Sequence, residues 1–323
     1  FNDENIKLFI QPYLPLLEIK QVKLSSNNEF GFKIKKKFQI SDFSINSKIQ
    51  LEEFSFLNNN KFDNFFPKVN KILRFSNHKL DINYKKDNLV IKGLGDILLQ
   101  KNIDQLTYII KKSGKKYNFK NSLIINKNSL VLDFLNFEKD QNSQMKISFN
   151  GDSELGKKTK INLISAIEGE NQFEIKNLEL NKKFKISNFS NIRINYLDRE
   201  NLINKFNITS NNGNYLLKGS SFNADHFIKK WISSDDELNL LKKKFDLKIK
   251  IDELFLDKSN LLDNFEGNLI FVDNEIAGGN LSGYFSKNEK LNLTIKSTHS
   301  EKITTLFLDR AEPIVKRYKF IKG

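Results

Sequence analysis

Apolar and polar residues alternate along most of this chain. The segment FDLKIKI at residues 245–251 has an apolar side chain at every second position and a charged one between. A period of two places the apolar side chains on one face of a β-sheet and the charged side chains on the other. The same pattern recurs from residue 17 onward, and it predicts a mainly β protein whose strands each have one apolar face.

Further strands are expected wherever this alternation recurs. These segments lie at residues 17–24, 30–34, 38–40, 43–45, 49–51, 80–84, 89–91, 123–125, 130–134, 145–149, 161–163, 173–180, 184–186, 192–196, 206–208, 215–217 and 290–297. Turn residues such as Asn150–Asp152 and Asn211–Asn214 separate several of them. Links this short join antiparallel neighbours, so the sequence predicts a long, twisted antiparallel meander. The slip in the alternation at Lys176-Asn177 predicts a β-bulge.

Helices are predicted at only a few places. They are short and lie at about residues 61–73, 224–243 and 303–318, with a further short one at 104–112. In these segments apolar residues recur at helical spacing; in the second, Phe227, Ile228 and Trp231 share one side. Its later part begins with the capping-box pattern Ser234–Glu237.

One-sided strands of this kind need something to cover their apolar face. A sheet can pack against a second sheet, close on itself, or curl into a trough that holds an apolar ligand. Four alternating apolar residues span about 20 Å along a strand, and one bilayer leaflet has about 15 Å of hydrocarbon. A single strand can therefore line most of an acyl chain, although the strands of a two-sheet sandwich are equally long.

The composition restricts the chemistry that the chain can perform. Its 323 residues include no cysteine, which excludes disulfides and thiolate chemistry within this span. The formal net charge of +14 is compatible with an anionic partner, either a phospholipid surface or a nucleic acid. The lysines are spread along the chain, and the clusters Lys35–Lys37, Lys157–Lys160 and Lys242–Lys244 are either solvated or contact an anionic surface.

The sequence offers no residue pattern typical of catalysis or metal binding. Its three histidines, His78, His226 and His299, have no metal-ligand spacing and are interpreted as surface or capping residues. Gly93–Gly95 lacks the third glycine of a dinucleotide site, and Ala277–Gly279 is interpreted as a bulge or close backbone contact within a strand. Nearly all aromatic residues are Phe, which favours core or lipid contact over base stacking. We therefore expect no enzymatic activity, no cofactor, no metal and no nucleic acid partner.

No stretch approaches the roughly 18–20 apolar residues that a membrane-spanning helix needs. The best candidate, residues 8–19, is short and is interrupted by Pro12 and Pro15. Because the chain begins at Phe1 rather than Met, we expect it to be a piece of a longer protein, with any signal or membrane anchor upstream.

Three segments near the C-terminus form a motif set. They are Ser221–Asp225 followed by a short helix, the strand pair with Asn264–Gly267 and Gly278–Gly283, and the closing segment Asp309–Gly323. Together these segments resemble the AsmA-like family of Gram-negative envelope proteins, the relatives of AsmA, TamB and YhdP. The closing segment is similar to the family's acidic opening, amphipathic helix and final Tyr-x-x-Ile-x-Gly.

The resemblance covers residues 220–323 and contains no catalytic residue. Glu312-Pro313 stand where many members of the family have Gly after the opening residues. The resemblance implies a long β-groove with an apolar lining, in a periplasmic protein anchored to the inner membrane by a segment not present here. Such proteins are thought to carry phospholipid toward the outer membrane. On this basis, we expect residues 1–323 to form one elongated β-groove segment, with the family's C-terminal type of region at 220–323.

On this hypothesis, phospholipid acyl chains bind in the groove between inner and outer membrane, and headgroups stay at its open edge near lysines. The lining residues that we expect are Phe173, Ile175, Leu178, Leu180, Leu247, Ile249, Ile251, Leu291, Leu293 and Ile295. Each would keep an acyl chain out of water at roughly 25 cal/mol per Å² of apolar area. The main alternative is a structural β-sandwich or solenoid of an envelope scaffold or adhesin with a dry core. A third alternative, a nucleic-acid binder, predicts DNA affinity that falls steeply with salt.

Overall fold

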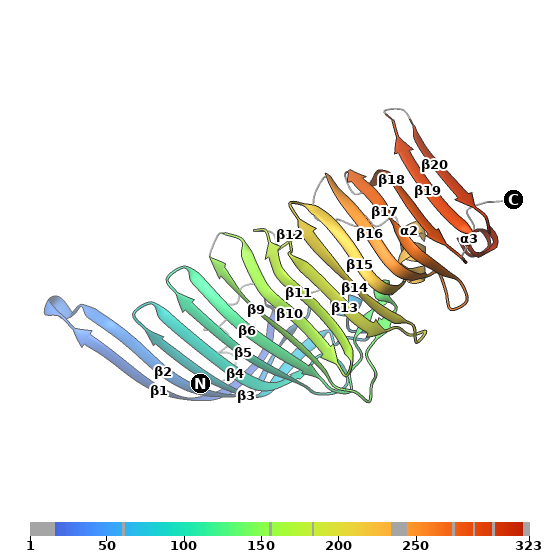
Figure 1. Ribbon diagram of the computed structural model, residues 1–323. Coiled ribbons are helices and arrows are strands. Elements are labelled where there is room, and N and C mark those ends of the chain that lie inside the picture. The colour runs from blue at the N-terminus through green and yellow to red at the C-terminus, as the bar shows by residue number, and fades with distance from the viewer. Residues whose placement is uncertain are drawn as a thin grey trace. The chain divides into compact units, whose positions relative to one another are not determined.

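A computed structural model describes most of the chain. The described residues are 17–59, 62–154, 157–182, 184–233, 244–272, 275–286, 288–298 and 301–318. Within them the protein is mainly β, as the alternation predicts, with short helices between the strands (Figure 1). The chain divides into two compact units. Unit 1 holds the described residues up to Val131 together with Lys139–Gly169, and unit 2 holds Leu132–Glu138 and the described residues from Glu170 onward.

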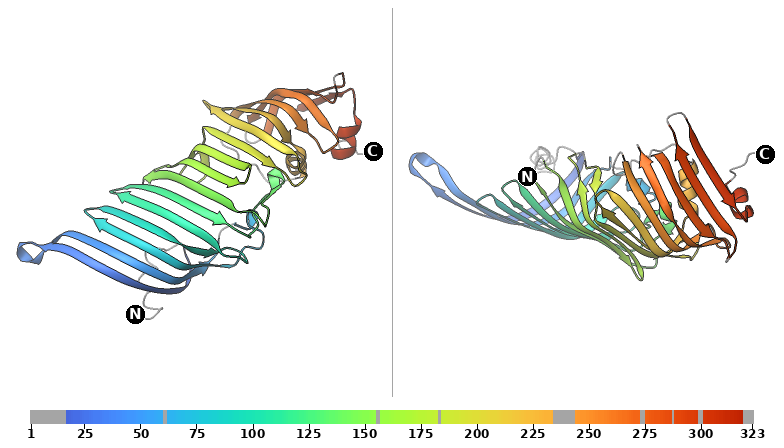
Figure 2. Two further views of the ribbon diagram at one scale, coloured as in Figure 1. Left: turned by 60° about the horizontal axis from the view of Figure 1, so that its bottom comes forward. Right: turned by 45° about the horizontal axis from the view of Figure 1, so that its top comes forward.

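The sheet of unit 1 is an antiparallel meander. Each strand pairs with the next from β1 to β6, then β6 pairs with β9 and β9 with β10. Its strands are β1 (Ile19–Ile34), β2 (Ile40–Leu57), β3 (Ile72–Lys85), β4 (Asn88–Leu98), β5 (Asp104–Ser113), β6 (Lys116–Ile125), β9 (Met145–Glu154) and β10 (Thr159–Glu168). β1 and β2, with 16 and 18 residues, form a long curved hairpin (Figure 2).

The sheet of unit 2 begins at β11, which pairs with both β12 and β13. From β13 onward each strand pairs with the next as far as β20. Its strands are β11 (Asn171–Leu180), β12 (Ile186–Asn188), β13 (Asn191–Leu197), β14 (Ile203–Asn211), β15 (Asn214–Asn223), β16 (Lys244–Phe255), β17 (Leu261–Val272), β18 (Glu275–Tyr284), β19 (Lys290–Ser297) and β20 (Lys302–Leu308).

Short elements connect these strands. β7 (Val131–Leu132) and β8 (Phe137–Glu138) form a separate two-stranded sheet around the 3-10 turn η4 (Asp133–Leu135). Two more 3-10 turns, η2 (Lys36–Phe38) and η3 (Phe62–Asn64), lie before and after β2. The α-helices of the described residues are α2 (Asp225–Ser233) and α3 (Glu312–Tyr318). Neither is long and apolar enough to cross a lipid bilayer.

The parallel pairing of β15 with β16 corrects the expected all-antiparallel meander. After β15 the chain forms α2, and it then re-enters the sheet at β16 in the same direction as β15. A parallel pair needs a crossover of about a dozen residues or more, and residues 224–243 provide it. Short turn signals elsewhere do join antiparallel strands as predicted.

The predicted helices are only partly confirmed. α2 lies within the predicted 224–243, whose residues 234–243 fall outside the described part of the chain, and α3 forms the end of the predicted 303–318. The prediction is wrong at residues 302–308, which form β20, and at 104–112, which belong to β5. Both segments are rich in β-branched residues, which favour strands. The predicted helix at 61–73 is also wrong: only η3 is helical there, Pro67 follows it, and β3 begins at Ile72.

Turns and bulges follow the sequence signals only in part. Asn211–Asn214 forms the β14–β15 hairpin, with positive φ at Asn212 and Gly213 as a type I′ turn requires. Asn177 has a φ of 51°, but the pairs Lys176–Asn191 and Glu179–Asn188 on either side of it keep the same register, so the bulge predicted at Lys176-Asn177 is wrong in position. The register shift of β11 lies between Glu179 and Leu180. Asn150–Asp152 was predicted as a turn, which is wrong, because these residues lie inside β9.

Unit 1 has a closed core at one end of its sheet. The buried side chains come from the strand ends and from the links after β2, β4 and β6: Phe66, Leu73, Ile97, Leu99, Ile125, Leu130, Val131 and Met145. The buried Lys139 donates hydrogen bonds to the carbonyl oxygens of Asn126, Asp140 and Ser143, at 2.5–2.7 Å. Burial lowers the pKa of Lys139, while the nearby Glu168 and other carboxylates oppose that shift. This end of unit 1 is therefore fixed by both apolar and polar contacts.

Unit 2 buries clusters of aromatic rings. Phe137 of β8 packs against Phe173 of β11 and Tyr196 of β13, with ring centroids 4.8 and 5.7 Å apart. The Tyr196 hydroxyl donates to the carbonyl oxygen of Leu135 at 2.7 Å. A second set of contacting rings consists of Phe189, between β12 and β13, and Tyr215, Phe245 and Phe271 on β15, β16 and β17. The segment between β7 and β8 therefore packs on unit 2.

Candidate functional site

Strand pairing in unit 2 aligns apolar residues into rows that cross the sheet. Residues paired across neighbouring strands point to the same face, so a run of apolar pairs makes a continuous apolar strip. The central row of unit 2 consists of Ile175, Ile192, Ile208, Leu217, Ile249, Gly267, Leu281, Leu293 and Leu306. It runs from β11 to β20, and at about 4.8 Å between strands its length is of the order of 40 Å.

Two further rows lie beside the central row of unit 2. One consists of Phe173, Ile194, Phe206, Gly219, Ile251 and Phe265. The other consists of Tyr215, Leu247, Leu269, Gly279, Ile295 and Thr304. Three neighbouring rows on one face make a broad apolar surface, since alternate residues along each strand are about 7 Å apart.

Unit 1 has an equivalent central row. It consists of Ser47, Ile82, Ile91, Ile110, Phe119, Gly151 and Ile161. A neighbouring row consists of Ile49, Leu80, Gly93, Tyr108, Asn121, Phe149 and Ile164. On the other side, the shorter row Phe30, Ile45, Tyr84 and Leu89 leads toward the end of the β1–β2 hairpin.

The opposite face of each sheet is mainly polar. In unit 2 one such row consists of Lys176, Asn191, Thr209, Leu216, Lys248, Asn268, Asn280, Thr294 and Thr305. In unit 1 the corresponding row consists of Lys48, Asp81, Lys92, Ile109, Lys120 and Asn150. The two faces therefore differ in chemistry, and only one suits an apolar ligand.

Many side chains in the central rows remain half-buried. In unit 1 this holds for Ile82, Ile91, Ile110 and Phe119, and in unit 2 it holds for most of the row, with Leu306 38% exposed. The interior of a two-sheet sandwich would bury such positions. Among the described residues, each unit has one sheet with these rows and no second sheet packed over them within that unit. The central rows are therefore partly open to solvent.

The residues predicted to line a groove lie in these rows or next to them. Their placement is as follows: Ile175, Ile249 and Leu293 in the central row, Phe173 and Ile251 in the second, Leu247 and Ile295 in the third, Leu291 paired with Gly283 and Leu308, and Leu178 and Leu180 on either side of Glu179 near the end of β11. Five of them, Leu178, Ile249, Ile251, Leu291 and Ile295, are buried by neighbouring side chains, and the others are half-buried. Phe173 also packs under Phe137, so part of the second row is covered.

Sequence reasoning did not single out the unit 1 rows or several members of the unit 2 rows. Ile91, Ile192 and Leu217 occur in segments predicted as strands, whereas Ile110 lies in the segment 104–112 that was predicted as a helix. Only strand register shows that these residues and Leu281 lie in the two central rows. The signal that could have found them was the phase of alternation in successive strands, read across each hairpin.

Glycines occupy positions in the rows where neighbouring strands approach closely. Gly267 and Gly279 have φ values of 157° and 147°, and each faces the partner strand's backbone. A Cβ at Gly267 would lie 2.0 Å from the carbonyl oxygen of Asn280, and a Cβ at Gly279 would lie 2.2 Å from that of Asn268. In unit 1 the Tyr108 ring lies over Gly93. Glycine therefore avoids a clash with the partner strand's backbone at Gly267 and Gly279, and with the Tyr108 ring at Gly93.

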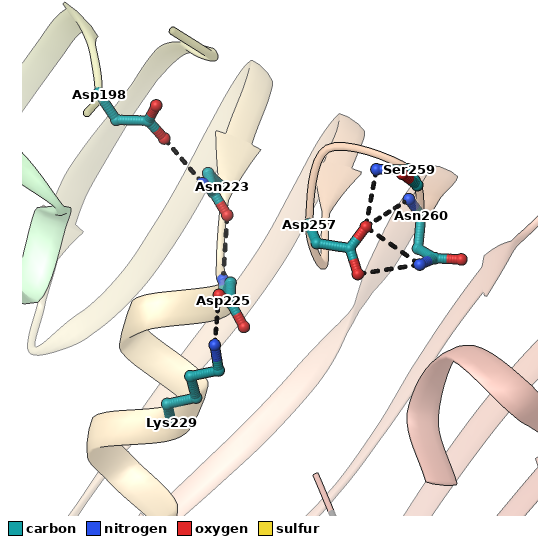
Figure 3. A network of polar contacts seen from close by, with 7 residues as sticks. All are labelled: Asp198, Asn223, Asp225, Lys229, Asp257, Ser259 and Asn260. Atoms are coloured by element: carbon teal, nitrogen blue, oxygen red, sulfur yellow. Dashed lines mark hydrogen bonds and ion pairs between the residues drawn. The ribbon is translucent and has the colours of Figure 1, made fainter. Parts of the chain in front are cut away.

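A buried polar network fixes the start of α2 against the sheet of unit 2 (Figure 3). The Asn223 amide donates to Asp198 Oδ2 at 2.7 Å, and its Oδ1 accepts from the backbone N–H of Asp225 at 3.2 Å. The Asn223 backbone N–H donates to Asn204 Oδ1 at 2.7 Å, and Lys229 Nζ donates to Asp225 Oδ2 at 2.9 Å. The residues of this network other than Lys229 are all buried: Asp198, Asn204, Asn223 and Asp225. Its role is to position α2, because its polar groups bond to one another.

A second polar turn shown in Figure 3 closes the β16–β17 hairpin. The Asp257 carboxylate accepts hydrogen bonds from the backbone N–H groups of Ser259 and Asn260, at 2.7 and 2.9 Å. Such a carboxylate turn stabilises a hairpin and offers no site of its own. Within the described residues, no group of three or more His, Cys, Asp or Glu side chains is placed to hold a metal ion.

One histidine corrects a sequence-based expectation. His78 was interpreted as a surface or capping residue, but it is fully buried in β3 between Phe75 and Tyr108. Its Nδ1 lies 3.2 Å from the carbonyl oxygen of Ser76, so Nδ1 is the protonated nitrogen. His226 is half-buried in α2, and His299 lies outside the described residues.

Comparisons with known proteins add no relative to this picture: no protein-family model, no curated protein and no solved structure matches the chain. The candidate site therefore rests on its own geometry. Its chemistry is that of an apolar surface about three rows wide in each unit.

Proposed function

We propose that the apolar faces of units 1 and 2 hold the acyl chains of phospholipids, and that the chain is a non-enzymatic segment of a lipid-transfer protein. The observation that carries the proposal is the pair of central rows, which are continuous, largely apolar and for the most part half-buried. Leaving such surface in water costs roughly 25 cal/mol per Å². An acyl chain lying along the rows would remove that cost without any directional bond.

The dimensions of the rows suit a phospholipid tail. One leaflet's hydrocarbon is about 15 Å thick, and the central row of unit 2 is more than twice that length at about 4.8 Å per strand. A row can therefore contact a whole tail, and successive tails can lie along it. The headgroup would stay in water at the open edge of the apolar face.

The setting that we propose follows the resemblance at residues 220–323. On that resemblance, the protein belongs with the AsmA-like envelope proteins and conducts phospholipid across the periplasm between inner and outer membrane. The segment Ser221–Asp225 that contributes to the resemblance holds the buried Asn223 and Asp225, and these residues position α2. Their role is structural, which agrees with the lack of any catalytic residue in the motif set.

Native mass spectrometry of the purified chain tests the proposal directly. We expect phospholipid to co-purify with the protein, and we expect its amount to fall when a central row is made polar. Leu293→Glu is the informative variant in unit 2, because Leu293 is half-buried and in the central row. Thr294→Glu is its matched control, since Thr294 is the next residue of β19, is also half-buried and lies in the polar row.

Photocrosslinking provides a second readout at the same positions. A photoreactive residue at Leu293 should crosslink to phospholipid, and one at Thr294 should not. Equal lipid yields at the two positions would reject the assignment of the apolar face. A chain that carries no phospholipid when extracted from membranes would favour the rival function, an envelope scaffold with a dry core.

A further inference from the structure

The end of the β1–β2 hairpin exposes an unusual number of large apolar side chains. We define the β1–β2 tip as residues 30–43, at the turn between these strands. Its exposed apolar residues are Phe30 (61%), Phe32 (51%), Ile34 (63%), Phe38 (91%), Ile40 (65%) and Phe43 (41%). Single exposed apolar residues are ordinary, but a contiguous group of this kind marks an interaction surface.

The tip extends past its neighbour in the sheet. The last pair between β2 and β3 is Ser44–Lys85, whereas β1 and β2 continue to pair with each other as far as Ile34–Ile40. Among the described residues, the tip beyond Ser44 therefore has no third strand beside it. A protruding hairpin can reach a flat surface that the rest of the sheet does not touch.

Lysines are interleaved with the apolar residues of the tip. Lys33, Lys35, Lys36 and Lys37 are all exposed, and the only acidic residue of the tip, Asp42, is paired with Lys33 at 2.9 Å. No ion pair among the described residues involves Lys35, Lys36 or Lys37. The tip therefore combines an apolar surface with uncompensated positive charge.

The other hairpins at the same edge of unit 1 are also basic. Lys85 and Lys86 lie at the β3–β4 turn. The β5–β6 and β9–β10 turns lie at the same edge of the sheet, because every second turn of an antiparallel meander falls on the same side. A hollow of about 830 Å³ lies between these turns. Its lysines are Lys111, Lys112, Lys116, Lys157 and Lys158, with Asp152 and Glu154 as its acidic residues. Positive charge is thus in excess along this edge.

We propose that the β1–β2 tip docks on an anionic phospholipid bilayer. Its Phe and Ile side chains insert at the level between headgroups and acyl chains, and the lysines of the tip and of the neighbouring turns contact the headgroup phosphates. Apolar insertion and attraction of lysines to an anionic leaflet are the two contributions that bind peripheral proteins to membranes. The sequence left the Lys35–Lys37 cluster open between solvation and an anionic surface, and the exposed Phe and Ile residues around it favour the surface.

Other occupants fit the tip less well. A nucleic acid would need aromatic rings next to arginine for stacking, but the tip has no Arg and includes the aliphatic Ile34 and Ile40. A protein partner's hot spot is typically rich in Trp, Tyr and Arg, which the tip also lacks. The tip is connected to the apolar face of unit 1, since Phe30 and Phe43 lie 6.3 Å apart and Phe43 and Tyr84 lie 6.1 Å apart.

Vesicle flotation of the full chain tests this inference. The probe is a set of phosphatidylcholine vesicles with 30% phosphatidylglycerol, compared with phosphatidylcholine alone, and we expect binding mainly to the anionic vesicles. Phe32→Ser combined with Phe38→Ser should weaken it at least tenfold, and Lys35→Glu with Lys36→Glu and Lys37→Glu should weaken it similarly. The substituted side chains are exposed, so these variants should fold normally.

Matched controls separate the tip from general surface properties. Phe184→Ser removes another exposed Phe that is also flanked by lysines, but in unit 2. Lys48→Glu with Lys92→Glu and Lys120→Glu makes the same charge change on the polar face of unit 1. Both controls should bind the anionic vesicles within about twofold of the original chain. Equal losses in the tip variants and the controls, or no loss in any variant, would overturn the inference.

Insertion has its own readout. In a Trp231→Phe background, which removes the single tryptophan of the chain, Phe38→Trp should show blue-shifted emission on anionic vesicles and quenching by brominated acyl chains. Emission that stays at its value in water would overturn insertion. The inference does not depend on lipid in the groove: tip variants should keep all co-purified phospholipid, while Leu293→Glu should carry less of it and still bind vesicles. Membrane docking by the tip and lipid binding by the apolar faces can therefore be rejected independently of each other.

Discussion

At the residue scale, the rows depend on positions where only glycine fits. Gly267 and Gly279 lie at cross-strand positions in the central and third rows of unit 2, and each has a positive φ. The residues paired with these glycines are Ile or Leu. The sheet therefore combines large apolar side chains with closely spaced backbones. An added methyl group there would meet a backbone carbonyl oxygen, which cannot move without disturbing strand pairing.

Gly267→Ala should therefore destabilise the protein. The added Cβ would lie 2.0 Å from the Asn280 carbonyl oxygen, and the φ of 157° disfavours an L-residue. We expect a loss of about 2 kcal/mol or more in the free energy of unfolding, within the range for strained backbone positions, measured by urea denaturation. Gly278→Ala is the control, because its nearest neighbour outside the adjacent residues is 3.5 Å away. An equal loss in both variants would show that the close approach at Gly267 does not set the cost.

His78 should make the stability of unit 1 depend on pH. Burial lowers the pKa of His78 below 6.5, and the Ser76 carbonyl and the charge of Asp96 oppose this shift only in part. Since the unfolded state then binds more protons than the folded one, stability is full above about pH 6.5 and falls as the pH drops toward the folded pKa. The slope should not exceed about 1.4 kcal/mol per pH unit for one group.

Urea denaturation between pH 8 and pH 5.5 measures that slope. In the His78→Leu variant the slope over this range should become smaller, whatever the absolute stability, because leucine cannot titrate. The range stays above the ordinary pKa of carboxyl groups, so acidic residues with unshifted pKa contribute little. A slope that is unchanged in His78→Leu would assign the pH dependence to other groups.

At the scale of single elements, α2 is held by polar contacts as well as by packing. It forms part of the crossover that makes β15 and β16 parallel, and Asn223 links its start to Asp198 on the β13–β14 connection. The backbone N–H of Ala224 also donates to the carbonyl oxygen of Phe255 at 2.9 Å. These contacts therefore hold α2 against the sheet at the place where the parallel β15–β16 pair interrupts the antiparallel order of the strands.

Asn223→Ala should loosen α2. It removes a hydrogen bond to the buried Asp198 carboxylate, and losing a hydrogen bond to a charged buried group costs about 1.5–3 kcal/mol. We expect faster amide hydrogen exchange in Asp225–Ser233, with little change in the strands of unit 1. Asn214→Ala is a suitable control, because Asn214 is exposed at the start of β15 and accepts only a long hydrogen bond of 3.4 Å. Exchange in α2 that matches this control would mean that packing alone holds the helix.

Strands were predictable from the sequence, and several helices were not. Alternation identifies a strand locally, because each residue's face depends only on its neighbours along the chain. The apolar residues at 61–73 also fit helical spacing, but no α-helix forms over the described residues 62–73. Pro67 interrupts the segment, and Ile72 pairs with β2 as the first residue of β3. The segment at 303–308 shows the same error, a helix predicted where a strand forms, because Ile303, Thr304 and Thr305 favour the strand that pairs with β19.

At the scale of the whole molecule, the division into units was not visible in the sequence. Leu132–Glu138 belongs to unit 2, although unit 1 precedes and follows it in the chain. The Arg199 guanidinium shows the reason: it forms ion pairs with Asp133 and Glu138 at 3.2 and 3.1 Å, and these residues are more than 60 positions away. Likewise, the predicted lining residues lay only in unit 2, because the row in unit 1 depends on register between strands.

The two rows lead to a prediction about lipid occupancy. Ile91→Glu places a charge in the central row of unit 1, as Leu293→Glu does in unit 2, and each position is half-buried. If each unit holds acyl chains on its own face, each variant should lower the number of co-purified phospholipids in part, and the double variant should lower it by the sum. Native mass spectrometry counts the bound lipids.

The controls for this experiment lie one residue away in the same strands. Lys92→Glu and Thr294→Glu change charge on the polar faces of β4 and β19, and they should leave the count unchanged. A single variant that empties both units would instead show that lipids occupy the two faces cooperatively, since independent faces cannot respond to one substitution. Loss in the control variants to the same degree would mean that charge, and not an apolar face, determines binding. The count therefore tests a feature that both units share, an apolar row in register across hydrogen-bonded strands.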